Sequence, residues 1–291
     1  MNELVIPRNI SKVQEQYLSL PFQRYGIDTD ENQLDIRLQA IEKIPELLQY
    51  YPKASQAFDL ILKDLRVAVQ WDMARTITTG RLKMNDHGKT HAMVAAASSL
   101  QILSLLWDEG IKPDIISFGV GDIDDAHVIV LLSALCHDIG NGIHRMHHLT
   151  HSLLLVQPIL DTILPELYED DESAAYVRMM ILSAINSHHG DPNPLTVESS
   201  IVSIGDASDM TKGRADHSDD MTRASIHAIS TLSIEDVIIT KGKVKPVEIQ
   251  IMLSHIAGMY QIQETLLPKI KSGIISDNIS IYIPLQNQYI W

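Results

Sequence analysis

The stretch Leu131-Leu-Ser-Ala-Leu-Cys-His-Asp-Ile-Gly140 decides how this chain of 291 residues folds. It predicts an apolar helix that begins near Val128 and ends just before a glycine, with His137 and Asp138 at its end. Burying adjacent histidine and aspartate side chains costs several kcal/mol unless both find partners. A metal ion is such a partner, because neutral imidazole and ionised carboxylate are both good ligands. For an isolated His-Asp pair, an ordinary helix end with an exposed aspartate is the simpler reading.

Three further polar segments lie at the ends of predicted helices. Asp86-His-Gly-Lys-Thr-His91 opens an alanine-rich helix over about 90–107, and Ser187-His-His-Gly-Asp191 closes a helix over about 173–189. Ile204-Gly-Asp-Ala-Ser-Asp209 places two aspartates three residues apart on a helix over about 197–210. Because apolar helices rarely carry unpaired acids, this recurrence on four predicted helices favours a metal site over separate surface residues.

A further group of histidines follows the His-Asp pair. We predict a helix from about 145 to 164, kinked at Pro158. His144, His148 and His151 have the i, i+4, i+7 spacing that would line one face of this helix.

The remaining segments indicate a helical domain followed by a small mixed module. Residues 1–30 read as an irregular arm, and helices are predicted over about 32–51 and 55–76, with loops over 79–88 and 110–125. After residue 224 the sequence becomes rich in Ile and Val. Strands over 226–240 and 244–253, a helix over 258–271 and a strand over 279–284 predict a β-β-α-β module over 225–291. We therefore expect a mainly α fold with a helical domain over 31–224.

Composition excludes several classes of protein. A net charge of −14 argues against an extended nucleic-acid surface, which needs clustered Lys and Arg. No apolar run of membrane-spanning length is present, and the first residues lack a signal-peptide pattern. The single cysteine, Cys136, cannot form a disulfide within one chain. We expect a soluble cytoplasmic protein without a membrane partner.

In order along the chain, His91, His137-Asp138, His188-His189 and Asp206 resemble the H…HD…H…D signature of HD-domain metal-dependent phosphohydrolases. The resemblance covers roughly residues 80–215 and implies a helical bundle. The Asn-Asp-His-Gly sequence at 85–88 is similar to that of uncharacterised prokaryotic and archaeal HD proteins.

The resemblance implies which residues bind metal. His91, His137, Asp138 and Asp206 would hold one divalent ion, and Asp138 would bridge to a second if there is one. His148 and His188 match the extra histidines of binuclear members. Competing or additional ligands are His189, His151 and Asp209. The mixed histidine and carboxylate shell suits one or two ions of Mn, Fe, Ni, Co or Zn.

The implied reaction is hydrolysis of a phosphoester by metal-activated hydroxide. Asp138 would serve it as the bridging carboxylate, and His87, four residues before His91, would protonate the leaving oxygen. Nearby cations would bind phosphate, and we expect this role first of all for Arg145 and Lys212, with Lys89 and Arg214 also flanking the ligands. We expect a small phosphorylated substrate such as a nucleotide, and the Ile- and Val-rich module suggests a homodimer.

Two other functions are compatible with the sequence. The chain could be a non-catalytic sensor that binds metal or nucleotide and signals through its C-terminal module. An RNA-processing role ranks lower, because Tyr260, Tyr282 and Tyr289 do not make an obvious stacking platform. The absence of Gly-Tyr-Pro after His188-His189 weakens the case for cyclic dinucleotides.

Overall fold

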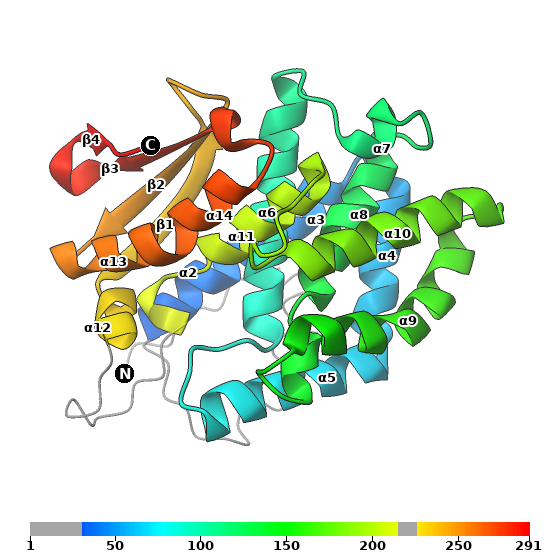
Figure 1. Ribbon diagram of the computed structural model, residues 1–291, viewed down its shortest axis with the longest axis horizontal. Helices are drawn as coiled ribbons and strands as arrows, with labels where there is room; N and C mark the ends of the chain where they lie inside the picture. Colours follow the sequence, from blue (N-terminus) through cyan, green and yellow to red (C-terminus); the bar gives the residue numbers. More distant parts are fainter. Residues whose placement is uncertain (1–30, 215–225) are drawn as a thin grey trace, which may run out of the picture.

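The computed structural model describes residues 31–214 and 226–291 and shows a helical domain with a small sheet on one side (Figure 1). The predicted arm over 1–30 and the predicted domain boundary near 224 lie outside these residues. The helices of the first part are α2 (Glu31–Glu42), α3 (Ile44–Leu48), α4 (Pro52–Lys63), α5 (Leu65–Arg75), α6 (Lys89–Asp108), α7 (Asp114–Ser117), α8 (Ile123–Cys136), α9 (His148–Leu167), α10 (Asp171–Ser187) and α11 (Val197–Ser208).

Helices α6 and α8 form the centre of the helical domain. Every residue of α8 from Asp124 to Cys136 is buried, because α4, α6, α10 and α11 all pack around it. A helix that is apolar on all sides must be enclosed in this way. Helix α6 is the one described helix long and apolar enough to cross a membrane, but 72% of its apolar window is buried inside the protein. We therefore assign α6 to the core.

The second part is a C-terminal module (residues 226–291) that contains the predicted β-β-α-β order, with an additional helix before it and a short additional strand after it. Its elements are α12 (Ile226–Leu232), β1 (Ile234–Lys241), β2 (Val247–Leu253), α13 (Met259–Gln261), a π-helical turn (Ile262–Leu266), α14 (Leu267–Ser272), β3 (Ile279–Ile283) and β4 (Gln288–Tyr289). Strand β1 pairs antiparallel with β2, β2 parallel with β3, and β3 antiparallel with the short β4. The mainly α fold with a small α+β module is thus confirmed.

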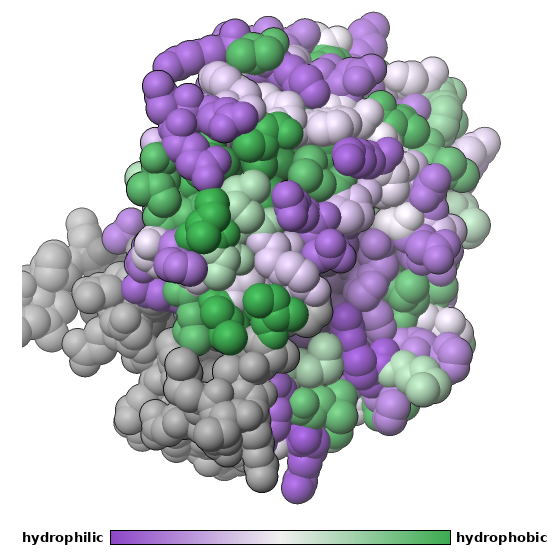
Figure 2. All heavy atoms as spheres, turned by 60° about the vertical axis from the view of Figure 1, so that its left-hand side comes forward, coloured by the Kyte–Doolittle hydropathy of each residue, from purple (hydrophilic) through white to green (hydrophobic). Residues whose placement is uncertain are grey.

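Helix α14 and the turn before it lie against α11, and β1 lies against α6, so the module is packed on the helical domain (Figure 1). On the face in Figure 2, apolar side chains form small groups separated by polar ones. No broad apolar surface is seen among the described residues of that face.

Several predicted boundaries were wrong. The strand predicted from Ile226 begins only at Ile234, because Ser230 and Thr231 of α12 accept hydrogen bonds from the Gln261 amide (3.1 and 3.0 Å) and hold this segment as a helix. Tertiary contacts here override β propensity. The helix predicted over 55–76 is two helices, since the Asp64 carboxylate accepts the Arg66 N–H and starts α5.

Two more corrections concern segments beside the predicted ligands. Helix α8 begins at Ile123 rather than near Val128, because Asp122 and Asp125 form a capping box at its start. Helix α9 begins at His148, after His147 in the left-handed conformation (φ 63°). His144 therefore precedes the helix, and the predicted helical face shared by His144, His148 and His151 does not exist.

Candidate metal centre

The six side chains predicted as principal ligands come together at one point between helix ends. They are His91, His137, Asp138, His148, His188 and Asp206. His91 lies in the first turn of α6, His137 and Asp138 follow α8, His148 begins α9, His188 follows α10, and Asp206 lies in the last turn of α11. All six are buried.

Four of these side chains form a first group of ligand atoms. His91 Nε2 lies 3.1 Å from His137 Nε2, 3.4 Å from Asp138 Oδ2 and 3.1 Å from Asp206 Oδ1. His137 Nε2 lies 3.3 and 3.5 Å from the same two carboxylate oxygens. Ligands about 2.1 Å from a tetrahedral ion lie about 3.4 Å from one another. The spacing therefore fits ligands of one metal ion.

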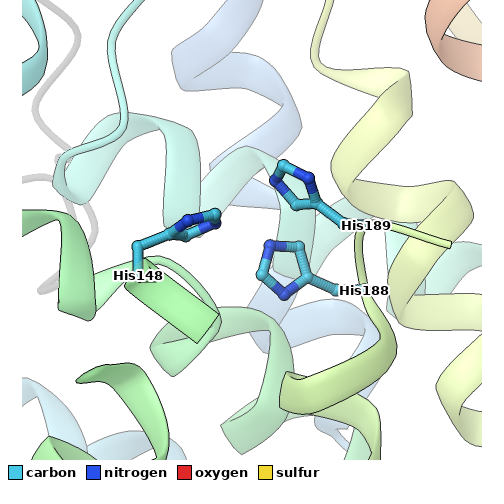
Figure 3. Close-up of side chains that lie close together, drawn as sticks. All are labelled: His148, His188 and His189. Carbon is cyan, nitrogen blue, oxygen red and sulfur yellow. The ribbon is translucent and has the colours of Figure 1, made fainter. Parts of the chain in front are cut away.

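Asp138 joins this first group to a second one. Its other oxygen, Oδ1, lies 3.4 Å from His148 Nε2 and 3.7 Å from His188 Nε2. His148, His188 and His189 also form a cluster in which ligand atoms lie within 4.8 Å, and Figure 3 shows the three rings facing one another. The Asn141 amide donates to Asp138 Oδ1 (2.8 Å) and fixes the carboxylate between the two groups. The arrangement can accommodate one ion or two.

Hydrogen bonds on the far side of each ring orient the histidines. The Nδ1 atoms of His137, His148 and His188 lie 2.7, 3.0 and 2.7 Å from the carbonyl oxygen three residues earlier. His91 Nδ1 lies 2.8 Å from Asp209 Oδ2. A carbonyl or carboxylate oxygen can only accept, so Nδ1–H donates, and in the neutral ring Nε2 then carries the lone pair that a metal ion can bind. Four Nε2 atoms thus face the centre beside two carboxylates.

Charges around the centre show that it attracts cations. Burial lowers the pKa of His137, but the Asp138 and Asp206 charges outweigh this and raise it to about 10. Burial also opposes ionisation of Asp138 and Asp206, yet their cationic neighbours hold both pKa values well below the usual range. The pKa of His91 is likewise raised, so protons on His91 and His137 would give way to the positive charge of a metal ion when it binds.

The unsatisfied Nε2 atom of His188 gives a separate test of whether a metal fits. It is buried and has no hydrogen-bond partner among the described residues. Burial lowers the pKa of His188 to about 4, so the ring is neutral at pH 7. Leaving such an acceptor unsatisfied costs about 1–3 kcal/mol. A cation beside Asp138 Oδ1 would satisfy it, so this donor set fits a transition metal.

Asp209 supports His91 from behind and is not brought to the ligand group. Its carboxylate accepts from His91 Nδ1 and from the Arg37 guanidinium (2.9 Å). Burial opposes its ionisation, but Arg37 and His91 hold the Asp209 pKa far below its ordinary value. On the other side, Arg214 Nη2 lies 3.2 Å from His91 Nε2 while Nη1 donates to the Asp209 carbonyl (2.9 Å).

A cleft of about 500 Å³ opens over the centre. Its lining includes Asp138 and Asp206 from the centre, His87 and His189 from the rim, and four cationic side chains. The cations are Lys83, Arg145, Arg214 and Lys269. Arg145 Nη1 lies 3.9 Å from Asp138 Oδ1, and its Nη2 lies 3.4 Å from His189 Nε2. An anion in this cleft would meet positive charge on several sides.

Of the four cations predicted to bind phosphate, only Arg145 and Arg214 line this cleft. Lys212 is directed elsewhere, because its ammonium pairs with Glu235 (2.6 Å) at the start of β1. Lys89 lies over the Trp71 ring, 5.8 Å from its centre, and burial lowers its pKa to about 8. His151 does not join either ligand group, since His148 alone of α9 faces Asp138.

His87 lies beside His91, with ring centres 5.6 Å apart, and lines the cleft. Its Nδ1 lies 2.5 Å from the Asn85 carbonyl oxygen. Burial lowers the pKa of His87 well below its usual value, which favours the neutral ring. Its predicted part as proton donor stays a prediction.

Three residues of the site did not stand out in the sequence. Arg37 comes from α2, Asn141 follows the His-Asp turn, and Lys269 comes from α14 of the C-terminal module. A polar residue three positions after Asp138 is a weak signal for Asn141. Arg37 and Lys269 are distant in sequence, and no local pattern marks them.

Comparison with known proteins agrees with this geometry. The family described as HD domain matches residues 101–211. An uncharacterized protein of Methanocaldococcus jannaschii, MJ1020, is 36% identical over 251 residues, which cover 86% of this chain and 93% of that protein. No solved structure matches significantly. The helical fold, the adjacent His-Asp pair at the end of α8 and these matches together show that the chain belongs to the HD-domain superfamily.

Proposed function

We propose that this protein is a metal-dependent phosphohydrolase that cleaves a small phosphoester, such as a nucleotide. One observation carries the proposal: the Nε2 atoms of four histidines converge with two carboxylates, and Asp138 lies between two ligand groups. His91, His137, Asp138 and Asp206 would hold one divalent ion, and Asp138, His148 and His188 a second. Bound ions would supply a nucleophilic water at neutral pH and offset phosphate charge.

The chain's own residues bind and orient the substrate. Arg145 and Arg214 present guanidinium groups on two sides of the centre, where they can donate to phosphate oxygens. His189 lines the cleft beside Arg145, and His87 lies on the opposite side next to His91. We infer that His87 passes a proton to the leaving oxygen once a bound phosphate anion raises the pKa that burial lowers.

The cleft supports a small substrate rather than a polymer. Its volume of about 500 Å³ falls within the range of small-molecule sites, about 300–1,000 Å³. The net charge of −14 would also repel long nucleic acid, while the local cations favour a compact anion. We also propose that the protein is located in the cytoplasm.

Measuring metal content and phosphoester hydrolysis in the wild type and in site-directed variants tests this function. Wild-type protein, reconstituted anaerobically with Mn²⁺ or Fe²⁺, is analysed for metal and assayed on nucleoside monophosphates, cyclic nucleotides and p-nitrophenyl phosphate. His148→Ala should lose one ion and at least 10-fold in activity, because it faces Asp138. His151→Ala, on the same helix, is the matched control and should keep both.

Asp138→Ala should lose all bound metal and all activity, since both groups share this carboxylate. A wild-type protein that binds no metal after reconstitution would refute the proposal. Metal binding without hydrolysis of any substrate would favour the non-catalytic sensor instead.

A further inference from the structure

Lys269 of the C-terminal module reaches the centre of the proposed site. Its side chain is buried, and its ammonium forms an ion pair with Asp206 Oδ2. The other oxygen of this carboxylate, Oδ1, faces His91 Nε2 (3.1 Å) and His137 Nε2 (3.5 Å). The two oxygens of Asp206 therefore have separate partners: two histidines of the helical domain face Oδ1, and Lys269 of the C-terminal module holds Oδ2.

The module is held closely against the helices that carry the ligands. Gly190, directly after His188-His189, has φ +86°, and a Cβ there would lie 2.9 Å from Ser272 Oγ of α14. A Cβ on Gly273 would lie 2.9 Å from Ser200 Oγ of α11. The same Ser200 hydroxyl accepts the Ile274 N–H (3.1 Å). These close approaches place α14 beside both the His188 turn and the helix of Asp206.

The module also builds one wall of the cleft. Its lining residues are Gln261, Glu264, Thr265, Pro268 and Lys269. The family match ends at residue 211, so this wall lies outside the matched domain.

From this geometry we propose that Lys269 is a positioning residue of the metal centre. It holds Asp206 Oδ2, so that only Oδ1 is available as a ligand, and the C-terminal module thereby completes the site. This inference rests on the proposed function, because it assigns Asp206 as a ligand. A carboxylate can bind a cation through one oxygen or two, and a hydrogen-bonded partner on one oxygen decides between these modes.

The visible absorption spectrum of bound Co²⁺ tests the inference directly. Its intensity falls when the coordination number rises, so it reports how Asp206 binds, independently of turnover. In Lys269→Met the carboxylate can use both oxygens, and we expect a weaker, shifted spectrum together with a loss of about 10–100-fold in kcat. Metal affinity is less informative, because removing a positive charge and removing a positioning contact act in opposite directions.

Two further variants separate positioning from general damage. Lys269→Arg keeps a charged donor and should lie closer to wild type than the methionine variant in both spectrum and kcat. Lys271→Met removes the same charge two residues along α14, where Nζ lies 5.2 Å from the centre of the Trp291 ring, and should change neither. Circular dichroism and thermal unfolding verify that each variant is folded.

The outcomes distinguish this inference from the function on which it rests. A wild-type protein that binds Co²⁺ and hydrolyses a phosphoester, with a folded Lys269→Met that has the same spectrum and kcat, would overturn the part given to Lys269 alone. Failure of the wild type to bind Co²⁺ would overturn both.

Discussion

Gly140, two residues after Asp138, should be intolerant of any side chain. A Cβ at this position would lie 2.1 Å from the His148 carbonyl oxygen and 2.5 Å from the Ser152 backbone nitrogen. Restoring an ordinary contact of 3.4 Å to the first atom requires a displacement of about 1.3 Å. Both obstructing atoms are backbone, so no side-chain rotation relieves the clash.

Gly140→Ala should therefore move the start of α9 away from the His-Asp turn. Ser152 normally connects them, since its hydroxyl accepts the Gly140 N–H (2.9 Å) and donates to the His137 carbonyl (2.7 Å). Overpacking a core costs about 1–3 kcal/mol, and a backbone clash places this variant at the upper end. A shift of about 1.3 Å also exceeds the tolerance of about 0.5 Å within which the groups of a site must be held. His148 should therefore no longer bind the same metal ion as Asp138.

Urea unfolding of metal-free protein measures the first effect, and metal content after reconstitution measures the second. Gly80→Ala is the control, because no atom lies within 4 Å of a Cβ at Gly80. It should change the free energy of unfolding by less than about 0.5 kcal/mol or increase it slightly. A Gly140→Ala protein with the unfolding midpoint and metal content of the control would refute the packing argument.

Two further predictions concern the core and the pH dependence of stability. A Cβ in Gly205→Ala would lie 2.0 Å from Ser99 Oγ, so this variant should lose about 1–3 kcal/mol of unfolding free energy. Adding Ser99→Ala removes the obstructing hydroxyl and should restore part of this loss, which a double-mutant cycle measured by urea unfolding would show. Full additivity of the two changes would contradict this contact. Burial lowers the pKa of His127, stacked on Tyr51, to about 4, so the stability from its neutral form is complete above pH 6.5 and lost as the pH falls toward 4. The loss of unfolding free energy should reach about 2 kcal/mol at pH 5. In urea titrations, His127→Phe should therefore lose less unfolding free energy between pH 8 and pH 5 than the wild type does. An equal loss in both proteins would contradict the lowered pKa of His127.

Much of the fold was predictable because its signals are local. The apolar run at 128–136 could only be a buried element, and the hairpin of β1 and β2 follows from two Ile- and Val-rich stretches around Lys241-Gly-Lys243. The errors fall where tertiary contacts decide. Helix α12 depends on Gln261, thirty residues away, and the start of α4 depends on Asp124, whose carboxylate accepts the N–H groups of Lys53 and Ala54 (both 2.9 Å).

The ligand set was more accessible to sequence reasoning than its surroundings. Six candidate ligands meet in the structure because each lies at a helix end or in a terminal turn of the bundle. By contrast, Lys269 lies on a short helix that also carries Lys271, and nothing in the sequence separates the buried ammonium from the exposed one. For Lys212 the sequence was misleading, because this residue is close to Asp206 in sequence but pairs with Glu235 and does not line the cleft.

The local encoding of two ligands has a simple physical basis. The last carbonyl groups of a helix lack an N–H partner within the helix. His137 and His188 each follow a helix directly and place Nδ1 2.7 Å from one of these carbonyl oxygens, that of Ala134 and that of Ile185. Each ring therefore donates its Nδ1–H to a free carbonyl oxygen at the helix end and leaves Nε2 as a possible ligand. The same hydrogen bond thus completes the helix end and directs Nε2 toward the metal centre. His91 stands in the first turn of α6, where no such carbonyl exists, and its orientation depends on Asp209, 118 residues away. This difference explains why the orientation of His137 and His188 can be predicted from the local sequence. The orientation of His91 depends on a contact that forms only in the folded chain.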